Sequence, residues 1–142
     1  MQLLQQRQNI LKALIFIFIT SFIHTSNAQI NVLWEGRFTS AGQNSDTGKE
    51  IEIDAAGNVY VVGTSYTDAT NGFDIVTIKY DALGNQLWAS TFNGSASSLD
   101  EGRDIGVDAN GNVYITGYTA STGPNYDYIT IKYDANGVQQ WA

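Results

Sequence analysis

The sequence contains no cysteine and only one histidine, His24, among its 142 residues. Without cysteine the chain has no disulfide, no thiol nucleophile and no thiolate metal ligand. A Ser-His-Asp triad, a Cys-His dyad and a His-ligated zinc site each need a histidine, and His24 lies in a segment that we expect to be removed. The length itself allows one ordinary domain or a few repeats of a larger array, which argues against a multidomain enzyme.

The longest apolar run, residues 13–23, is too short for a membrane-spanning helix, which needs about 20 residues. It follows the basic residues Arg7 and Lys12 and gives way to small residues up to Ala28. This order predicts a secretory signal peptide over residues 1–28, with a retained membrane anchor as the alternative. We therefore expect a secreted or cell-surface protein with no membrane span after cleavage.

Positive charge is scarce in the remaining chain. Residues 29–142 hold five basic residues against all 14 acids, a net charge of −9 over 114 residues. The acids are scattered rather than gathered in a tail, and proteins that bind nucleic acids need clustered lysine and arginine. Nucleic acid is therefore excluded as an expected partner.

An internal repeat fills most of the chain after residue 28. Residues 51–63 recur as 105–117, and residues 74–84 recur as 127–137, so the repeat is about 53 residues long. Three tryptophans, two glycine-containing turns and two Tyr-containing segments keep the same phase, which excludes chance. The shared positions are Trp34, Trp88, Trp141, Asp54, Gly57, Asn58, Tyr60, Gly63, Asp108, Gly111, Asn112, Tyr114 and Gly117.

Each repeat predicts four short strands and no helix. In the first repeat we expect them at residues 50–54, 58–64, 74–80 and 86–92. Alternating apolar residues mark the third strand. The Asp-x-x-Gly-Asn sequences between strands are typical of tight turns, because Asp accepts backbone hydrogen bonds and Gly adopts a positive φ.

Four-stranded repeats of this length predict an all-β fold of propeller blades. Within residues 29–142 we expect a strand at 31–38, one blade at 48–92 and a second blade at 102–142. A closed propeller needs about four to eight blades. We therefore expect this chain to be part of a larger propeller, completed by further blades in cis or by self-assembly in trans.

The repeat resembles a known family. The pattern Ile-Asp-x-x-Gly-Asn-Val-Tyr-Val-x-Gly, followed by Asp-Ile-x-Thr-Ile-Lys-Tyr-Asp-x-x-Gly-x-x-x-Trp, is similar to the seven-bladed β-propeller repeat called SBBP. It looks like the version found in secreted and surface proteins of Bacteroidetes-type bacteria. The resemblance covers residues 48–142 and implies the fold without implying an activity.

One turn has the donor spacing of a calcium loop. Asp108, Asn110 and Asn112 carry oxygen at alternating positions, as calcium ligands often do. The first repeat has Ala56 in place of Asn110, which favours a hairpin turn with an Asp cap over a calcium site. We expect no other cofactor.

The other acids are interpreted as structural. Asp74 and Asp127 open the third strands of the two repeats, and we expect them to cap turns or backbone, because catalytic residues are unique rather than repeated. The non-repeated stretches 65–72, 95–101 and 120–125 are expected to be polar loops, and with Tyr66 and Tyr126 they suit contacts with glycans or proteins.

These patterns predict a secreted structural or binding module for extracellular protein or polysaccharide, without catalysis of its own. One alternative is the non-catalytic propeller part of an exported hydrolase whose catalytic residues lie outside this chain. Another is a calcium-stabilised adhesin.

Overall fold

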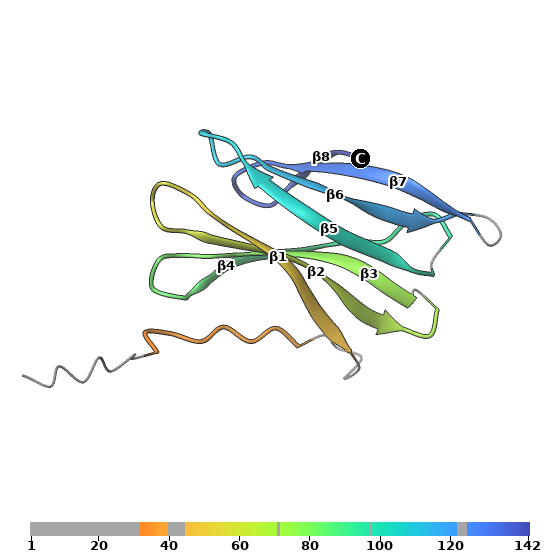
Figure 1. Cartoon of the computed structure of the whole chain (residues 1–142), viewed down its shortest axis with the longest axis horizontal. Coiled ribbons are helices and arrows are strands. Elements are labelled where there is room, and N and C mark those ends of the chain that lie inside the picture. The colour runs from red at the N-terminus through yellow and green to blue at the C-terminus, as the bar shows by residue number, and fades with distance from the viewer. Residues whose placement is uncertain (1–31, 40–44, 71, 97, 122–124) are drawn as a thin grey trace, which may run out of the picture. The chain divides into compact units, whose positions relative to one another are not determined.

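The computed structural model describes residues 32–39, 45–70, 72–96, 98–121 and 125–142, and the predicted signal peptide lies outside them. These residues form eight strands in two four-stranded antiparallel sheets (Figure 1). The predicted all-β class, with sheets that correspond to propeller blades, is confirmed. The described part of the chain has no helix long and apolar enough to cross a membrane.

The two sheets follow the two repeats in chain order. Blade 1 consists of β1 (Asp46–Ile53), β2 (Val59–Asp68), β3 (Gly72–Tyr80) and β4 (Gln86–Phe92). Blade 2 consists of β5 (Asp100–Val107), β6 (Val113–Ala120), β7 (Tyr126–Tyr133) and β8 (Gln139–Trp141). Every strand pairs with its neighbour in sequence. Both blades begin two residues earlier than the predicted limits of 48 and 102.

The β2–β3 hairpin is longer than the sequence predicts. β2 continues to Asp68, and Tyr66 pairs with Phe73 across the hairpin, so most of the predicted loop 65–72 belongs to strands. The reason is that ladder hydrogen bonds join backbone groups, and the polar Thr and Ser side chains of this stretch do not interrupt them.

The four turns at the other end of the blades share one geometry. In each, the glycine N–H donates to the carbonyl oxygen of the aspartate three residues earlier, at 2.9–3.0 Å. The four glycines have φ between 78° and 86°, which a residue with a Cβ adopts only at a cost: Gly57, Gly84, Gly111 and Gly137. In Figure 1 all four turns lie at the same end of the two sheets.

The predicted strand at residues 31–38 is wrong over its described part, 32–39, which has no strand assignment. This segment crosses a face of blade 1, where Trp34 and Phe38 pack against a cluster of four buried side chains: Val59, Val76, Ile78 and Tyr80. A strand needs the edge of a neighbouring strand for its backbone hydrogen bonds, whereas a sheet face offers only side chains. Asn31 itself lies outside the described residues.

The main hydrophobic core lies between the two blades, within the compact unit formed by residues 33–142. Its buried members come from both sheets: Tyr60, Val62, Ile75, Ile105, Val113, Ile115, Ile131 and Tyr133. Gly102 marks the closest approach, because a Cβ there would lie 2.5 Å from Cγ2 of Val62 and 3.0 Å from Cγ2 of Ile75. We call this blade 1–blade 2 contact the seam.

The close approach at Gly102 is testable with a control on the same strand. Gly102→Ala should lower the free energy of unfolding by about 1–3 kcal/mol, because the added methyl overpacks the seam. Gly106→Ala on the same strand, where a Cβ meets nothing within 4 Å, should change it by no more than about 0.5 kcal/mol. Urea unfolding measures both. Equal effects of the two substitutions would contradict a tightly packed seam.

Candidate functional site

A tryptophan of one blade lies over a glycine of the next blade. A Cβ at Gly137 would lie 2.6 Å from Cδ2 of Trp88, so only glycine fits beneath the indole. The Trp88 ring also lies 6.3 Å from the ring of Tyr133, and its Nε1–H donates to the carbonyl oxygen of Ala135 at 3.1 Å. Trp88 therefore fixes β4 of blade 1 against the β7–β8 turn of blade 2.

The same contact recurs one repeat earlier. Trp34 lies 5.8 Å from the ring of Tyr80, and a Cβ at Gly84 would lie 2.7 Å from its Cδ2. Trp34 thus sits on blade 1 as Trp88 sits on blade 2. Trp141, the third member, contacts Tyr114 of its own blade at 6.4 Å between ring centroids and is 47% exposed.

One face of blade 2 is open. Tyr114, Tyr128 and Trp141 define it, and we call it the open face of blade 2. At the position of Tyr128, blade 1 has Ile75, which is fully buried under blade 2, whereas Tyr128 is 78% exposed. The repeat thus indicates that a sheet of the same kind fits over this face.

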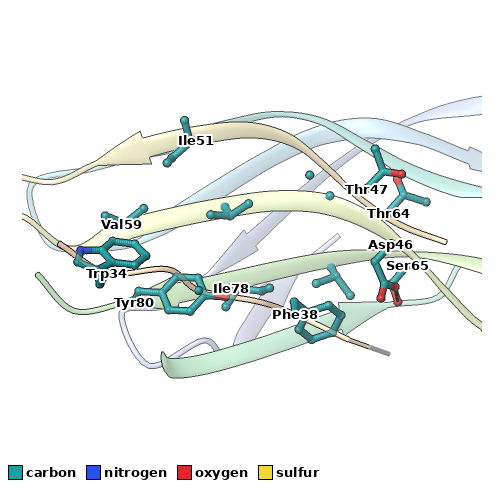
Figure 2. Close-up of a pocket in the computed structure, with 15 residues that line it drawn as sticks. Trp34, Phe38, Asp46, Thr47, Ile51, Val59, Thr64, Ser65, Ile78 and Tyr80 are labelled. Carbon is teal, nitrogen blue, oxygen red and sulfur yellow. Dashed lines mark hydrogen bonds between the residues drawn. The ribbon is translucent and has the colours of Figure 1, made fainter. Parts of the chain in front are cut away.

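Among the described residues of its own unit, the opposite face of blade 1 is covered only by residues 33–39. Beneath this segment lies a cavity of about 360 Å³, into which Trp34, Phe38 and Ile78 point (Figure 2). We call it the cavity face of blade 1. A Cβ at Gly48 would meet only Val61 of its own sheet, at 3.8 Å, whereas the equivalent Gly102 meets the neighbouring blade. The cavity therefore lies on the face of blade 1 that corresponds to the face of blade 2 packed against blade 1.

The turn that has the donor spacing of a calcium loop, and for which a hairpin with an Asp cap is favoured, is closed by hydrogen bonds. Oδ1 of Asp108 accepts from the backbone N–H groups of Asn110 and Asn112 at 2.9 Å, and Oδ2 accepts from Nδ2 of Asn112 at 2.8 Å and from the Tyr114 hydroxyl at 3.2 Å. The Asn112 side-chain hydrogen bond, stronger than the opposing desolvation, holds the pKa of Asp108 below its usual range.

The first repeat builds the same turn around Asp54, which accepts hydrogen bonds from Ala56, Asn58 and Tyr60. In the described ranges no group of three or more His, Cys, Asp or Glu side chains is placed to hold a metal ion. Calcium binding at Asp108, Asn110 and Asn112 stays a prediction.

The capping interpretation of Asp74 is wrong. Asp74 is 2% exposed, and its Oδ2 accepts a hydrogen bond from the Thr67 hydroxyl rather than from a turn backbone. Asp127, its repeat equivalent, is exposed at the start of β7. The two acids thus differ in burial although their local sequences are alike, and Asp74 lies beside the segment that leads into blade 2, where Phe73 forms a bridge with Leu99.

One ion pair across the seam was not predicted from the sequence. Nζ of Lys49 in β1 lies 2.8 Å from Oε1 of Glu101 in β5, and Nε of Arg103 lies 3.1 Å from the same oxygen. Glu101 occupies the position that Thr47 has in the first repeat. Comparison of the two repeats therefore does not predict an acidic partner for Lys49. Lys49 and Arg103, by contrast, are repeat equivalents.

Aromatic pairs lie at the end of the blades opposite the Asp turns. Tyr66 and Phe73 meet edge to face in blade 1, and Tyr118 and Tyr126 do so in blade 2, each with ring centroids 5.1 Å apart. Tyr126 is 56% exposed, and the Arg103 guanidinium lies 5.2 Å above the Tyr118 ring. Such aromatic and polar surfaces bind ligands with apolar faces and polar edges.

Comparison with protein families places residues 93–123, which include β5 and β6, as similar to the SBBP beta-propeller repeat. This match supports the family resemblance and agrees with the four-stranded sheets. A comparison with curated proteins found no significant match.

The Asp54 turn can be tested against a more exposed turn. Asp54→Ala should lower the free energy of unfolding by about 1–2 kcal/mol. The substitution removes the carboxylate oxygen that accepts the hydrogen bond of the Tyr60 hydroxyl, at the edge of the hydrophobic core. Asp134→Ala, whose hydrogen bonds are all exposed, should have a smaller effect. Thermal melts with and without calcium measure both, and a calcium-dependent rise in the melting temperature that persists in both variants would favour calcium binding at Asp108 and the adhesin alternative.

Proposed function

We propose that this chain is an exported structural and binding module made of propeller blades, whose partners are extracellular proteins or polysaccharides. The observation that carries the proposal is the division between the two ends of the blades. Repeated residues form the turns at one end, whereas at the other end the stretch 120–125 is not repeated and the exposed Tyr126 takes the place of Phe73. Scaffolds that bind partners place variable residues on a constant frame in this way.

The acidic residues support a role without catalysis. Asp54, Asp81 and Asp108 accept the backbone N–H groups of their own turns, and Glu101 is held by Lys49. A general acid or base needs access to a substrate proton. These carboxylates already accept hydrogen bonds within the fold.

Further blades are the proposed structural partners. The open face of blade 2 exposes Trp141 and Tyr128, and the cavity face of blade 1 exposes Ile51 at 54%. Both faces are the repeat equivalents of surfaces that are joined in the seam. Blades in cis, or another copy of the chain in trans, would remove this apolar surface from water.

Export is testable on the cell product. The charged start, the short apolar run and Ala28 support cleavage after that residue. Intact-mass analysis of protein from the extracellular fraction should give Gln29 as the first residue. A retained residue 1–28 segment in a membrane fraction would instead support the anchor.

Binding is testable with one substitution at each end of the blades. Tyr126→Ala should weaken binding to the best ligand of a glycan array by at least about fivefold, since a stacking ring contributes about 1 kcal/mol or more. Leu83→Ala removes a side chain that is 79% exposed in the β3–β4 turn and should leave binding unchanged. Binding that survives Tyr126→Ala would contradict this site, and hydrolysis of the glycan would favour the exported-hydrolase alternative.

A further inference from the structure

Two buried aspartates lie side by side across the seam. Asp74 of β3 is 2% exposed, and Asp100 of β5 is 1% exposed. Phe73 and Leu99 form a parallel bridge, and the Phe73 N–H donates to the carbonyl oxygen of Ser98 at 2.7 Å. The residues that follow the bridge are Asp74 and Asp100, so their backbones are separated by about one strand spacing, ~4.8 Å.

The two carboxylates are not hydrogen-bonded alike. Asp100 has a donor on each oxygen: the Gly94 N–H reaches Oδ2 at 2.6 Å, and the Thr119 hydroxyl donates to Oδ1. Within the part of the chain that the structure describes, Asp74 has a donor only on Oδ2, from Thr67, and its buried Oδ1 has no hydrogen-bond partner. Both oxygens of Asp100 thus already accept hydrogen bonds, and the bare Oδ1 of Asp74 is the oxygen of the pair that is left to carry a proton.

The surroundings add negative charge. The ionisable groups that act on Asp74 are Asp100 from β5 and Asp68 from the end of β2, and neither is basic. Glu101, next to Asp100, is held by Lys49, and the connection from Asn93 to Leu99 has no ionisable side chain. Burial, followed by the charges of Asp100 and Asp68, raises the pKa of Asp74 above its usual range, against the Thr67 hydrogen bond.

We propose that the seam binds a proton at Oδ1 of Asp74, beside the buried carboxyl group of Asp100, so that mild acid tightens the contact between the blades. When Asp74 carries the proton, its carboxyl group is neutral and no second negative charge is buried beside Asp100. Without it, two adjacent carboxylates of different blades repel each other in a buried setting.

The pair forms only where one blade covers the next. Asp74 belongs to blade 1 and Asp100 to blade 2, and the equivalent of Asp74 in blade 2, Asp127, is exposed. Asp46, the equivalent of Asp100, also accepts from a hydroxyl, that of Ser65 at 2.7 Å. The proton site is therefore a property of an assembled seam rather than of a single sheet.

The pH dependence has a definite sign. The folded state binds this proton more tightly than the unfolded state, in which Asp has its ordinary pKa of about 3.9. The stabilisation is thus complete below that value and is lost as pH rises through the raised pKa of folded Asp74. The Asp54 and Asp108 carboxylates, whose pKa values are lowered, lose their contribution only at lower pH.

Thermal unfolding tests the proposal on the chain from Gln29 to Ala142. The wild-type melting temperature should rise between about pH 8 and about pH 5. Asp74→Asn, which keeps the shape without the charge, should raise it at about pH 8 by about 4–8 °C and flatten the pH dependence. Asp127→Asn is the matched control and should change neither.

A second measurement does not depend on a variant that folds. Carbon-13 NMR of the wild-type carboxyl groups should show Asp74 titrating above the ordinary value for aspartate. A titration at or below that value would overturn the proposal. So would a wild-type melting temperature that stays constant or falls between about pH 8 and about pH 5, together with no gain from Asp74→Asn.

Discussion

The contact of an indole with a glycine of the next sheet is the constraint on which the rest of the structure depends. A methyl group at Gly137 would lie 2.6 Å from the Trp88 ring, so the ring and the bare backbone are required together. The positive φ of Gly137, 80°, is also the value that the hairpin turn needs. One residue type thus satisfies both the turn and the joint between sheets. Because the turn sets the register of β7 and β8, the same glycine places Tyr133 beneath the indole.

The two repeats are alike in their turns and unlike on their broad faces. Val62 and Ile75, which blade 2 buries, correspond to Thr116 and Tyr128 on the open face of blade 2. A surface that covers Thr116 and Tyr128 must accept a hydroxyl and a larger ring. The two blades are therefore specified by their side chains as well as by the shared tryptophan contact, and they are not interchangeable.

Most of the fold follows from the period of the sequence. Strand alternation, the Asp-x-x-Gly turns and the phase of Trp34, Trp88 and Trp141 predict two four-stranded sheets, and the sheets are found. Local patterns could not show that residues 32–39 cross a sheet face. Apolar residues such as Trp34 and Phe38 are expected both in a strand at a sheet edge and in a segment that packs on a sheet face. The burial of Asp74 could not be predicted for a similar reason, because Asp127 lies in the same local sequence and is exposed. The Lys49–Glu101 pair combines a repeated residue with a unique one, so periodicity cannot reveal it.

The tryptophan–glycine contact joins two different surfaces, one from the fourth strand of a sheet and one from the last turn of the following sheet. Such a contact gives the order of the two blades a direction, and it can recur between sheets without two identical faces meeting. A genetic duplication or deletion of one whole unit of about 53 residues would preserve every tryptophan with its glycine. Recombination between repeats can therefore alter the number of sheets while the geometry of each joint is inherited intact.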